Sequence, residues 1–221
     1  MNMKNAKMYV CICLICCLLF TSAYADDVFY DDENQIIDPG YNVLLDYVTA
    51  ESLQEVRVYL RDALGYNSAV TSGILANMVY ESKLDPTRYG DKYASYGICQ
   101  WNDERQDLLK DFAEEYDASP SELYLQLMFF GWEMRNYYPE LYDYLLNLPD
   151  SDFGASCAAS VICKQYEVPK GMTQQVEKRK YAAIWDYVYG SPDGESYVDV
   201  WNYLYEWPVL DEQTTSWVLL E

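Results

Sequence analysis

The sequence contains no histidine, and this absence excludes several classes of active site. Ser-His and Cys-His nucleophile pairs need an imidazole, and so do the commonest zinc sites. Carboxyl groups are then the remaining side chains that act as general acids and bases near neutral pH. We therefore expect no metal and no other cofactor, and any catalysis falls to the 36 Asp and Glu residues.

Basic residues are also scarce, at 15 Lys and Arg, so the chain carries a formal charge of −21. Nucleic acids and anionic lipids reward clusters of Lys and Arg, so neither is an expected partner. An acidic chain with few aromatic residues would indicate disorder. Here 24 Tyr and 6 Trp supply ample surface for burial, and the chain is expected to fold.

Cysteine is scarce outside the N-terminus, because four of the seven lie within the first 25 residues. The other three are Cys99, Cys157 and Cys163, an odd number that cannot form a full disulfide framework. One bridge from Cys99 to either of the others would suit an exported protein. Three buried thiols are the alternative, and we favour it.

Long apolar runs are missing except for one of 13 residues, Met8 to Phe20. Lys4 and Lys7 precede it, and Ala23-Tyr24-Ala25 follows as a small-x-small cleavage site, which is typical of a signal peptide over residues 1–25. The run is shorter than the roughly 20 residues that a membrane span needs. We therefore expect secretion without stable membrane insertion rather than an uncleaved anchor. Cleavage would leave a formal charge of about −23, because the segment holds two basic and no acidic residues.

Apolar residues at helical spacing predict a mainly α protein. Residues 26–50 are interpreted as an acidic leader, and residues 190–221 as an acidic, aromatic extension that packs back or binds a protein partner. Between them, a stretch with little helical period, Thr87 to Trp101, predicts a loop or small irregular hairpin. The expected helices are Leu53 to Leu64, a second capped by Ser68 and ending near Leu84, Asp103 to about Tyr116, one opened by the capping box Ser119-Pro120-Ser121-Glu122, a short one from Pro139, Phe153 to Tyr166, and Gln174 to Val188.

Glu81 is the first candidate catalytic residue, because it lies in the last turn of the apolar second helix. A carboxyl at the edge of the core is half desolvated, which raises its pKa and suits a general acid for a glycosidic oxygen. Asn77, one turn earlier on the same face, is expected to hydrogen-bond it. A solvated surface role is the commoner fate of a Glu near a helix end, so position alone does not decide.

The run GILANMVYESKLDP, residues 73–86, followed by SYGICQW, residues 95–101, resembles the phage-tail-type lysozymes. These are relatives of the goose-type lysozymes and lytic transglycosylases. The resemblance continues through Arg105, the stretch Tyr166-Glu167-Val168-Pro169, and Arg179 with Ala182. It implies a lysozyme-like α-helical domain over residues 51–189, with a small irregular β segment after the catalytic helix. The chain departs from the family in carrying Ala76 where Gly is frequent.

The resemblance also implies roles for single residues. Glu81 matches the catalytic acid, Gln100 and Trp101 match positions lining the sugar cleft, and Tyr166 matches an aromatic position near it. Ser82 and Tyr96, from the same two motifs, join these as substrate-binding candidates. An amide can pair with an acetamido group, and a ring can stack on a pyranose. Core packing for the two aromatic residues, and a bond to the loop backbone for Gln100, are the alternatives.

Inverting hydrolysis needs a second carboxylate that holds water across the sugar ring. Asp91 is the candidate, whereas Asp103 is interpreted as a helix cap and Asp85 as part of the turn before Pro86. If no second carboxylate reaches the sugar, the sugar's own 6-hydroxyl attacks, and the product is the 1,6-anhydro sugar of a lytic transglycosylase.

The sequence therefore predicts a secreted glycosidase that cleaves the β-1,4 bond between N-acetylmuramic acid and N-acetylglucosamine in peptidoglycan glycan strands. The main alternative is a non-catalytic module on the same fold that binds the cell wall or a partner. A salt-bridged Glu81, and a cleft filled by the C-terminal extension, would favour that alternative. A carboxylate peptidase is a weaker option, because no paired Asp-Gly signature is present.

Overall fold

A computed structural model describes residues 40–169 and 171–190. Within these residues the chain forms seven α-helices and one sheet of three short strands, which confirms the mainly α, lysozyme-like prediction. The predicted signal peptide, residues 26–39 of the predicted leader and residues 191–221 of the extension lie outside the described residues. No helix in the described ranges has the length and apolarity to cross a membrane.

The packed part of the chain begins before residue 51. A short 3-10 helix, Val43–Asp46, places Leu44 in the core with no exposed surface. Asn42 caps this turn through the Leu44 N–H, and its Nδ2 donates to Asp186 at 2.6 Å. Asp186 also accepts two hydrogen bonds from Nη2 of Arg57, so its buried charge is paired.

The first two predicted helices are present. α2 (Ala50–Val58) continues in a π-helical turn, Tyr59–Ala63, and the segment ends before Gly65, whose positive φ of 78° suits a chain reversal. α3 (Ser68–Ser82) is capped by Asn67, whose Oδ1 accepts from the Val70 N–H. The prediction of Ser68 as the cap is therefore wrong by one residue, because Ser68 already has helical geometry.

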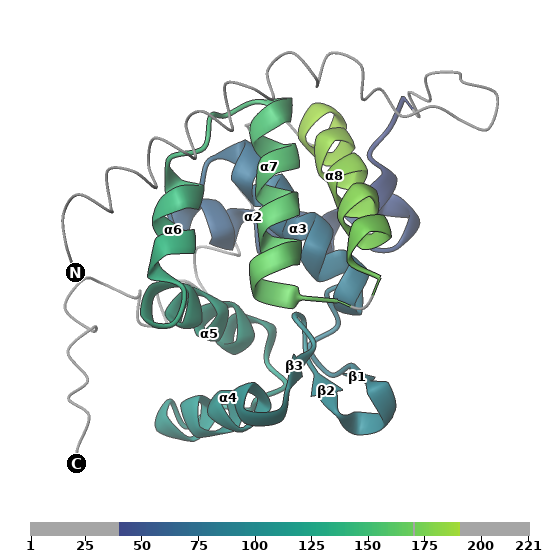
Figure 1. The fold of residues 1–221 in the computed structure, drawn as a ribbon. Coiled ribbons are helices and arrows are strands. Elements are labelled where there is room, and N and C mark those ends of the chain that lie inside the picture. Colours follow the sequence, from purple (N-terminus) through teal and green to yellow (C-terminus); the bar gives the residue numbers. More distant parts are fainter. Residues whose placement is uncertain (1–39, 170, 191–221) are drawn as a thin grey trace. The chain divides into compact units, whose positions relative to one another are not determined.

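α3 lies at the centre, with α7 (Asp152–Ile162) and α8 (Met172–Tyr189) packed against it and against each other (Figure 1). The backbones of α3 and α7 approach closely at Gly73, where an added Cβ would lie 2.5 Å from the Cβ of Ala158 and 2.7 Å from the Ala159 nitrogen. A second π-helical turn, Cys163–Glu167, follows α7.

The small irregular β segment lies beyond the C-terminal end of α3 (Figure 1). β1 (Tyr89–Gly90), β2 (Ser95–Tyr96) and β3 (Trp101–Asn102) form an antiparallel sheet in that order. Tyr96 is paired with Tyr89 on one side and with Trp101 on the other. The sheet thereby lies between the end of α3, which carries Glu81, and the helix that begins at Asp103.

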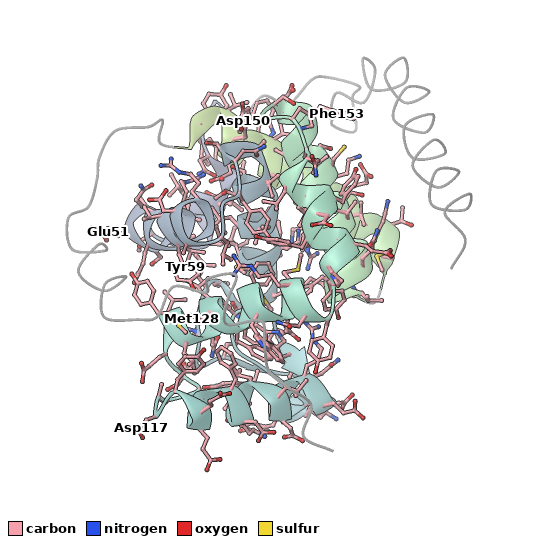
Figure 2. The ribbon with its side chains drawn as sticks, turned by 90° about the vertical axis from the view of Figure 1, so that its left-hand side faces the viewer. Glu51, Tyr59, Asp117, Met128, Asp150 and Phe153 are labelled. Atoms are coloured by element: carbon pink, nitrogen blue, oxygen red, sulfur yellow. The ribbon has the colours of Figure 1, made fainter. Side chains whose placement is uncertain are left out.

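α4 (Asp103–Glu115) and α5 (Leu123–Asn136) run side by side with aromatic side chains between them (Figure 2). Phe112 of α4 packs on Phe129 and Trp132 of α5, with ring centroids 5.4 and 5.7 Å apart. Asp103 is the first residue of α4 rather than its cap. α6 (Pro139–Leu146) begins at Pro139, as predicted.

The capping box predicted at Ser119 does not open α5. The helix begins at Leu123, and Glu122 accepts a hydrogen bond from the Ser119 N–H at 2.9 Å within the preceding turn. The reciprocal contact of the motif therefore closes a turn and not a helix end. The three cysteines of the domain, Cys99, Cys157 and Cys163, are free thiols, as the favoured prediction had it. Cys99 and Cys163 are buried as predicted, whereas the prediction of burial is wrong for Cys157, which is only partly buried.

Candidate active site

Glu81 lies in the last turn of α3 with 18% of its side chain exposed. One of its carboxylate oxygens pairs with Nη2 of Arg179 from α8, whose side chain is only 2% exposed. The carboxyl therefore stands at the edge of the core, but it faces a cation, and a cation favours the ionised form of a carboxyl. The predicted bond from Asn77 is wrong, because Asn77 Nδ2 donates to the backbone carbonyls of Gly73 and Ala159.

Arg179 is held in place from its own helix. Its Nη1 donates to Oε1 of Gln175 at 2.5 Å, and its guanidinium carbon lies 5.7 Å from the centre of the Tyr80 ring. Lys178 approaches the same ring at 4.2 Å. Nε of Arg179 is buried and has no hydrogen-bond partner. Arg179 is thus a fixed positive charge at the Glu81 carboxylate, a role that the sequence did not predict.

Ser82 fixes the end of α3 against the loop that follows. Its buried hydroxyl lies 3.2 Å from the Met78 carbonyl oxygen and 3.0 Å from that of Ile98. The second contact ties Glu81's neighbour directly to residues 95–101. Ser82 therefore positions the candidate acid, and its proposed contact with a sugar stays a prediction.

Gln100 is occupied by the loop around it. Its Nε2 donates to the carbonyls of Gly97 at 2.8 Å and Arg88 at 3.1 Å, and its Oε1 accepts from Ser95 Oγ at 2.9 Å. The sequence left a structural bond to the loop open as an alternative, and this bond is present. Tyr96 is mostly buried, with its ring 4.7 Å from that of Tyr89. Sugar contacts by both residues stay predictions.

Trp101 and Tyr166 meet at a buried carboxylate that the sequence did not single out. Trp101 Nε1 donates to Oε2 of Glu133 at 2.7 Å, and the Tyr166 hydroxyl donates to the same oxygen at 2.5 Å. Arg105 Nε and Nη2 bind the two Glu133 oxygens at 2.9 and 3.0 Å. In the sequence, the feature that could have indicated this buried carboxylate is that Glu133 is the one acidic residue in the mostly apolar α5.

This network places both aromatic rings in the core beneath the loop. Trp101 has no exposed surface and Tyr166 has 2%, so neither presents a ring face for a sugar to stack on in this structure. Burial, with the Glu133 carboxylate nearby, raises the pKa of Tyr166 well above its ordinary value. Their assignment to the sugar cleft stays a prediction, and the structure adds a packing role for both.

Glu167 brings a further carboxyl group to the region of Glu81. It ends the π-helical turn after α7, and Arg105 Nη1 holds that turn by donating to the Tyr166 carbonyl at 3.2 Å. Burial and the charge of Glu81 together raise the pKa of Glu167 well above its ordinary value. The sequence carried Glu167 only as part of a motif and gave it no role.

Asp91, the predicted base, has its backbone in a 3-10 turn, Asp91–Tyr93, directly after β1. Lys92 and Tyr93 in this turn have positive φ values of 58° and 77°. The side chain of Asp91 lies outside what the structure describes. Its role as the base stays a prediction. In the described ranges, no group of three or more Cys, Asp and Glu residues is arranged to hold a metal ion.

A family model described as phage tail lysozyme matches residues 51–189, which is well over half of the chain. The match begins in α2 and ends with α8, so it includes Glu81, Glu133, Glu167 and both arginines of the site. No match was found among curated proteins.

Proposed function

Because the chain belongs to the phage tail lysozyme family and so has a lysozyme-like, peptidoglycan-degrading function, we propose that it cleaves the β-1,4 bond between N-acetylmuramic acid and N-acetylglucosamine. Glu81 is the general acid of this reaction. The observation that carries the assignment is the position of its carboxyl at the edge of the core, on the residue next to Ser82, whose hydroxyl binds the loop of residues 95–101. Secretion through residues 1–25 belongs to the same proposal.

Glu81 is favoured over the other carboxyl groups of the site by access. Glu133 is buried and saturated by Arg105, Trp101 and Tyr166. Oε1 of Glu167 has no exposed surface. Glu81 keeps part of its side chain in solvent, so it is the member of this cluster that a bound sugar strand can approach.

Proton transfer from Glu81 to the glycosidic oxygen breaks the C1–O bond, and the bonding electrons leave with that oxygen. The Glu81 carboxylate that remains attracts the positive charge of the oxocarbenium-like sugar. This attraction is stronger at the partly desolvated edge of the core than in water. Water held by a second carboxylate, for which Asp91 is our candidate, completes hydrolysis. Attack by the sugar's own 6-hydroxyl would give the anhydro product instead.

The test compares wild type, Glu81→Gln and the control Glu114→Gln, which makes the same change at an exposed position of α4. Each protein is incubated with purified peptidoglycan, and the soluble fragments are measured by mass spectrometry. Loss of a general acid is expected to lower the rate about 10²- to 10⁴-fold for Glu81→Gln alone. The masses of the fragment ends separate reducing from anhydro products. Equal release by wild type and Glu81→Gln, or no release by wild type, contradicts the proposal.

The ion pair between Glu81 and Arg179 favours a second candidate function, a non-catalytic module that binds the cell wall. In that case the pair is only a structural link between α3 and α8. Wild type would then bind insoluble peptidoglycan without releasing fragments, and Glu81→Gln would bind equally well. Sedimentation of the protein with the wall, read beside fragment release, distinguishes the two functions.

A further inference from the structure

Three carboxyl groups and two guanidinium groups lie together around the end of α3. Arg105 makes two hydrogen bonds to Glu133, and Arg179 pairs with Glu81. The third carboxyl, Glu167, receives no hydrogen bond at its buried Oε1. Three carboxylates and two guanidinium groups have a formal charge of −1, so one added proton makes the set neutral. Glu167 is the carboxyl that is not paired with an arginine, so it is the group that binds this proton most favourably.

The unsatisfied atoms point to the same place. Oε1 of Glu167 and Nε of Arg179 are both buried without a hydrogen-bond partner. Buried polar atoms are nearly always paired in folded proteins, and a catalytic role is one of the explanations for an exception. The described residues contain seven buried side-chain atoms without a partner, and these two belong to side chains whose charges act on each other and on Glu81. The two atoms therefore mark the surroundings of the candidate acid.

The charged groups that act on Glu167 come from α3, α4, α5 and α8. Glu81 and Glu133 disfavour its ionised form, whereas Arg105 and Arg179 favour it. The thiols of Cys99 and Cys163 and the phenols of Tyr138 and Tyr166 are neutral neighbours of Glu167. Burial is the main cause that raises the pKa of each of these groups, and the charge of Glu167 raises it further. Desolvation is the largest effect on Glu167, and it favours the protonated form.

We propose that Glu167 holds the proton that Glu81 delivers to the glycosidic oxygen, so that Glu167 is a positioning residue that acts through Glu81. This inference rests on the proposed function of Glu81 as the general acid. It removes a difficulty of that function, because a carboxyl paired with arginine is by itself a poor proton donor near neutral pH. Two nearby carboxyls retain one proton between them to a higher pH than one carboxyl does.

The reaction balances with water as the co-reactant. The shared proton passes from the Glu81–Glu167 pair to the leaving oxygen, and the C1–O bond breaks towards that oxygen. Water then forms the new C1–O bond, and its released proton returns to the pair. In the transglycosylase variant of the reaction, the sugar's 6-hydroxyl takes the place of water and returns the proton in the same way.

The first experiment measures fragment release against pH for wild type, Glu167→Gln, Glu167→Asp and the control Glu114→Gln. Glu167→Gln is expected to retain activity at acid pH and to lose it as pH rises, with the alkaline midpoint lowered by about one unit or more. Glu167→Asp keeps a carboxyl group and is expected to lie between Glu167→Gln and wild type. A ratio of variant to wild-type rates that is constant with pH is what a purely structural role gives, and it overturns the inference.

The second experiment needs no turnover. Carbon-13 NMR of protein labelled at the glutamate carboxyl carbons follows each carboxyl through a pH titration. We expect one signal to stay protonated above the usual glutamate range, to vanish in Glu167→Gln, and to titrate at lower pH in Glu81→Gln. A Glu167 signal in the ordinary range overturns the inference even if the enzyme is active. Conversely, if the wild type is inactive but shows the expected titration, the proposed function and the proton transfer from Glu81 are refuted. The conclusion that Glu167 is protonated would then still hold.

Discussion

Glu133 is the residue on which three other residues of the site depend. Its two oxygens accept from Arg105, Trp101 and Tyr166, which come from α4, β3 and the turn after α7. Loss of the carboxylate would leave the buried Tyr166 hydroxyl without its acceptor, and an unpaired buried polar group is costly. Trp101 Nε1 would keep the Tyr166 oxygen at 3.0 Å, and Arg105 Nη1 the Tyr166 carbonyl at 3.2 Å. A single side chain of α5 thus joins β3 and α4 to the turn after α7 that carries Glu167.

Glu133→Gln is expected to lower the free energy of unfolding by about 3 kcal/mol, because it leaves the Arg105 charge uncompensated in a mostly buried place. Gln also offers only one acceptor oxygen to donors that now use two. Urea denaturation of this variant beside Glu114→Gln measures the difference. A change no larger than that of the exposed control would mean that the network relaxes around the amide.

The stability of the protein should also depend on pH through Glu167. Its pKa is raised in the folded state, so the folded protein binds the proton more tightly than the unfolded chain. The stabilising contribution is then present at low pH and is lost as pH rises from the ordinary value of 4.5 through the folded value. Gln cannot ionise, so Glu167→Gln should gain melting temperature relative to wild type as pH rises. A melting difference that does not change between about pH 4 and about pH 8 contradicts this reading.

At the scale of elements, apolar periodicity predicted the positions of the helices, but side-chain chemistry misplaced several of their ends. Ser68 and Asn67 are both good caps, and only the backbone geometry shows that Asn67 is the one used. The Ser119–Glu122 motif makes the contact of a capping box but closes a turn, because the helix begins at Leu123. Such local patterns are compatible with more than one backbone path.

The candidate site was partly visible in the sequence. Glu81 and the loop of residues 95–101 follow from two ordered motifs that lie close together in the chain. Glu133, Glu167 and Arg179 come from three distant segments. Their meeting depends on how α7 and α8 pack against α3, and on the hydrogen bond from Tyr166 that joins Glu133 of α5 to the turn after α7. No local pattern encodes that packing, so the charges that surround Glu81 emerged only with the fold.

The close contact of α3 with α7 gives a prediction for Gly73→Ala. Alanine is the better helix former by about 1 kcal/mol, which alone would stabilise α3. The added methyl would however press on the Ala159 backbone nitrogen as well as on Ala158, and the backbone cannot move aside cheaply. We expect a net loss of about 1–3 kcal/mol in thermal or urea unfolding, with a partial recovery in the double variant Gly73→Ala/Ala158→Gly. A stabilised single variant would show that the two helices separate easily.

At the scale of the whole molecule, the formal charge of −21 opposes the approach to a negatively charged wall. α4 contributes an exposed acidic surface, with Asp107, Asp111, Glu114 and Glu115 all open to solvent. Repulsion of this kind acts over a Debye length, about 30 Å at 0.01 M salt and about 8 Å at 0.15 M. Added salt therefore screens an unfavourable force in this protein, whereas in a basic enzyme it would screen a favourable one.

Release of fragments from intact anionic walls should thus rise when sodium chloride is increased from about 0.01 M to about 0.15 M. The chemistry proposed for Glu81 is local, so the rate at which peptidoglycan strands with amidated carboxyl groups are cleaved should change much less with salt. Replacing Asp111, Glu114 and Glu115 by lysine reverses part of the exposed charge of α4, and the gain with salt should shrink on intact walls only. If wild-type turnover of intact walls falls as salt is added, a local positive charge guides the substrate despite the net negative charge of the protein.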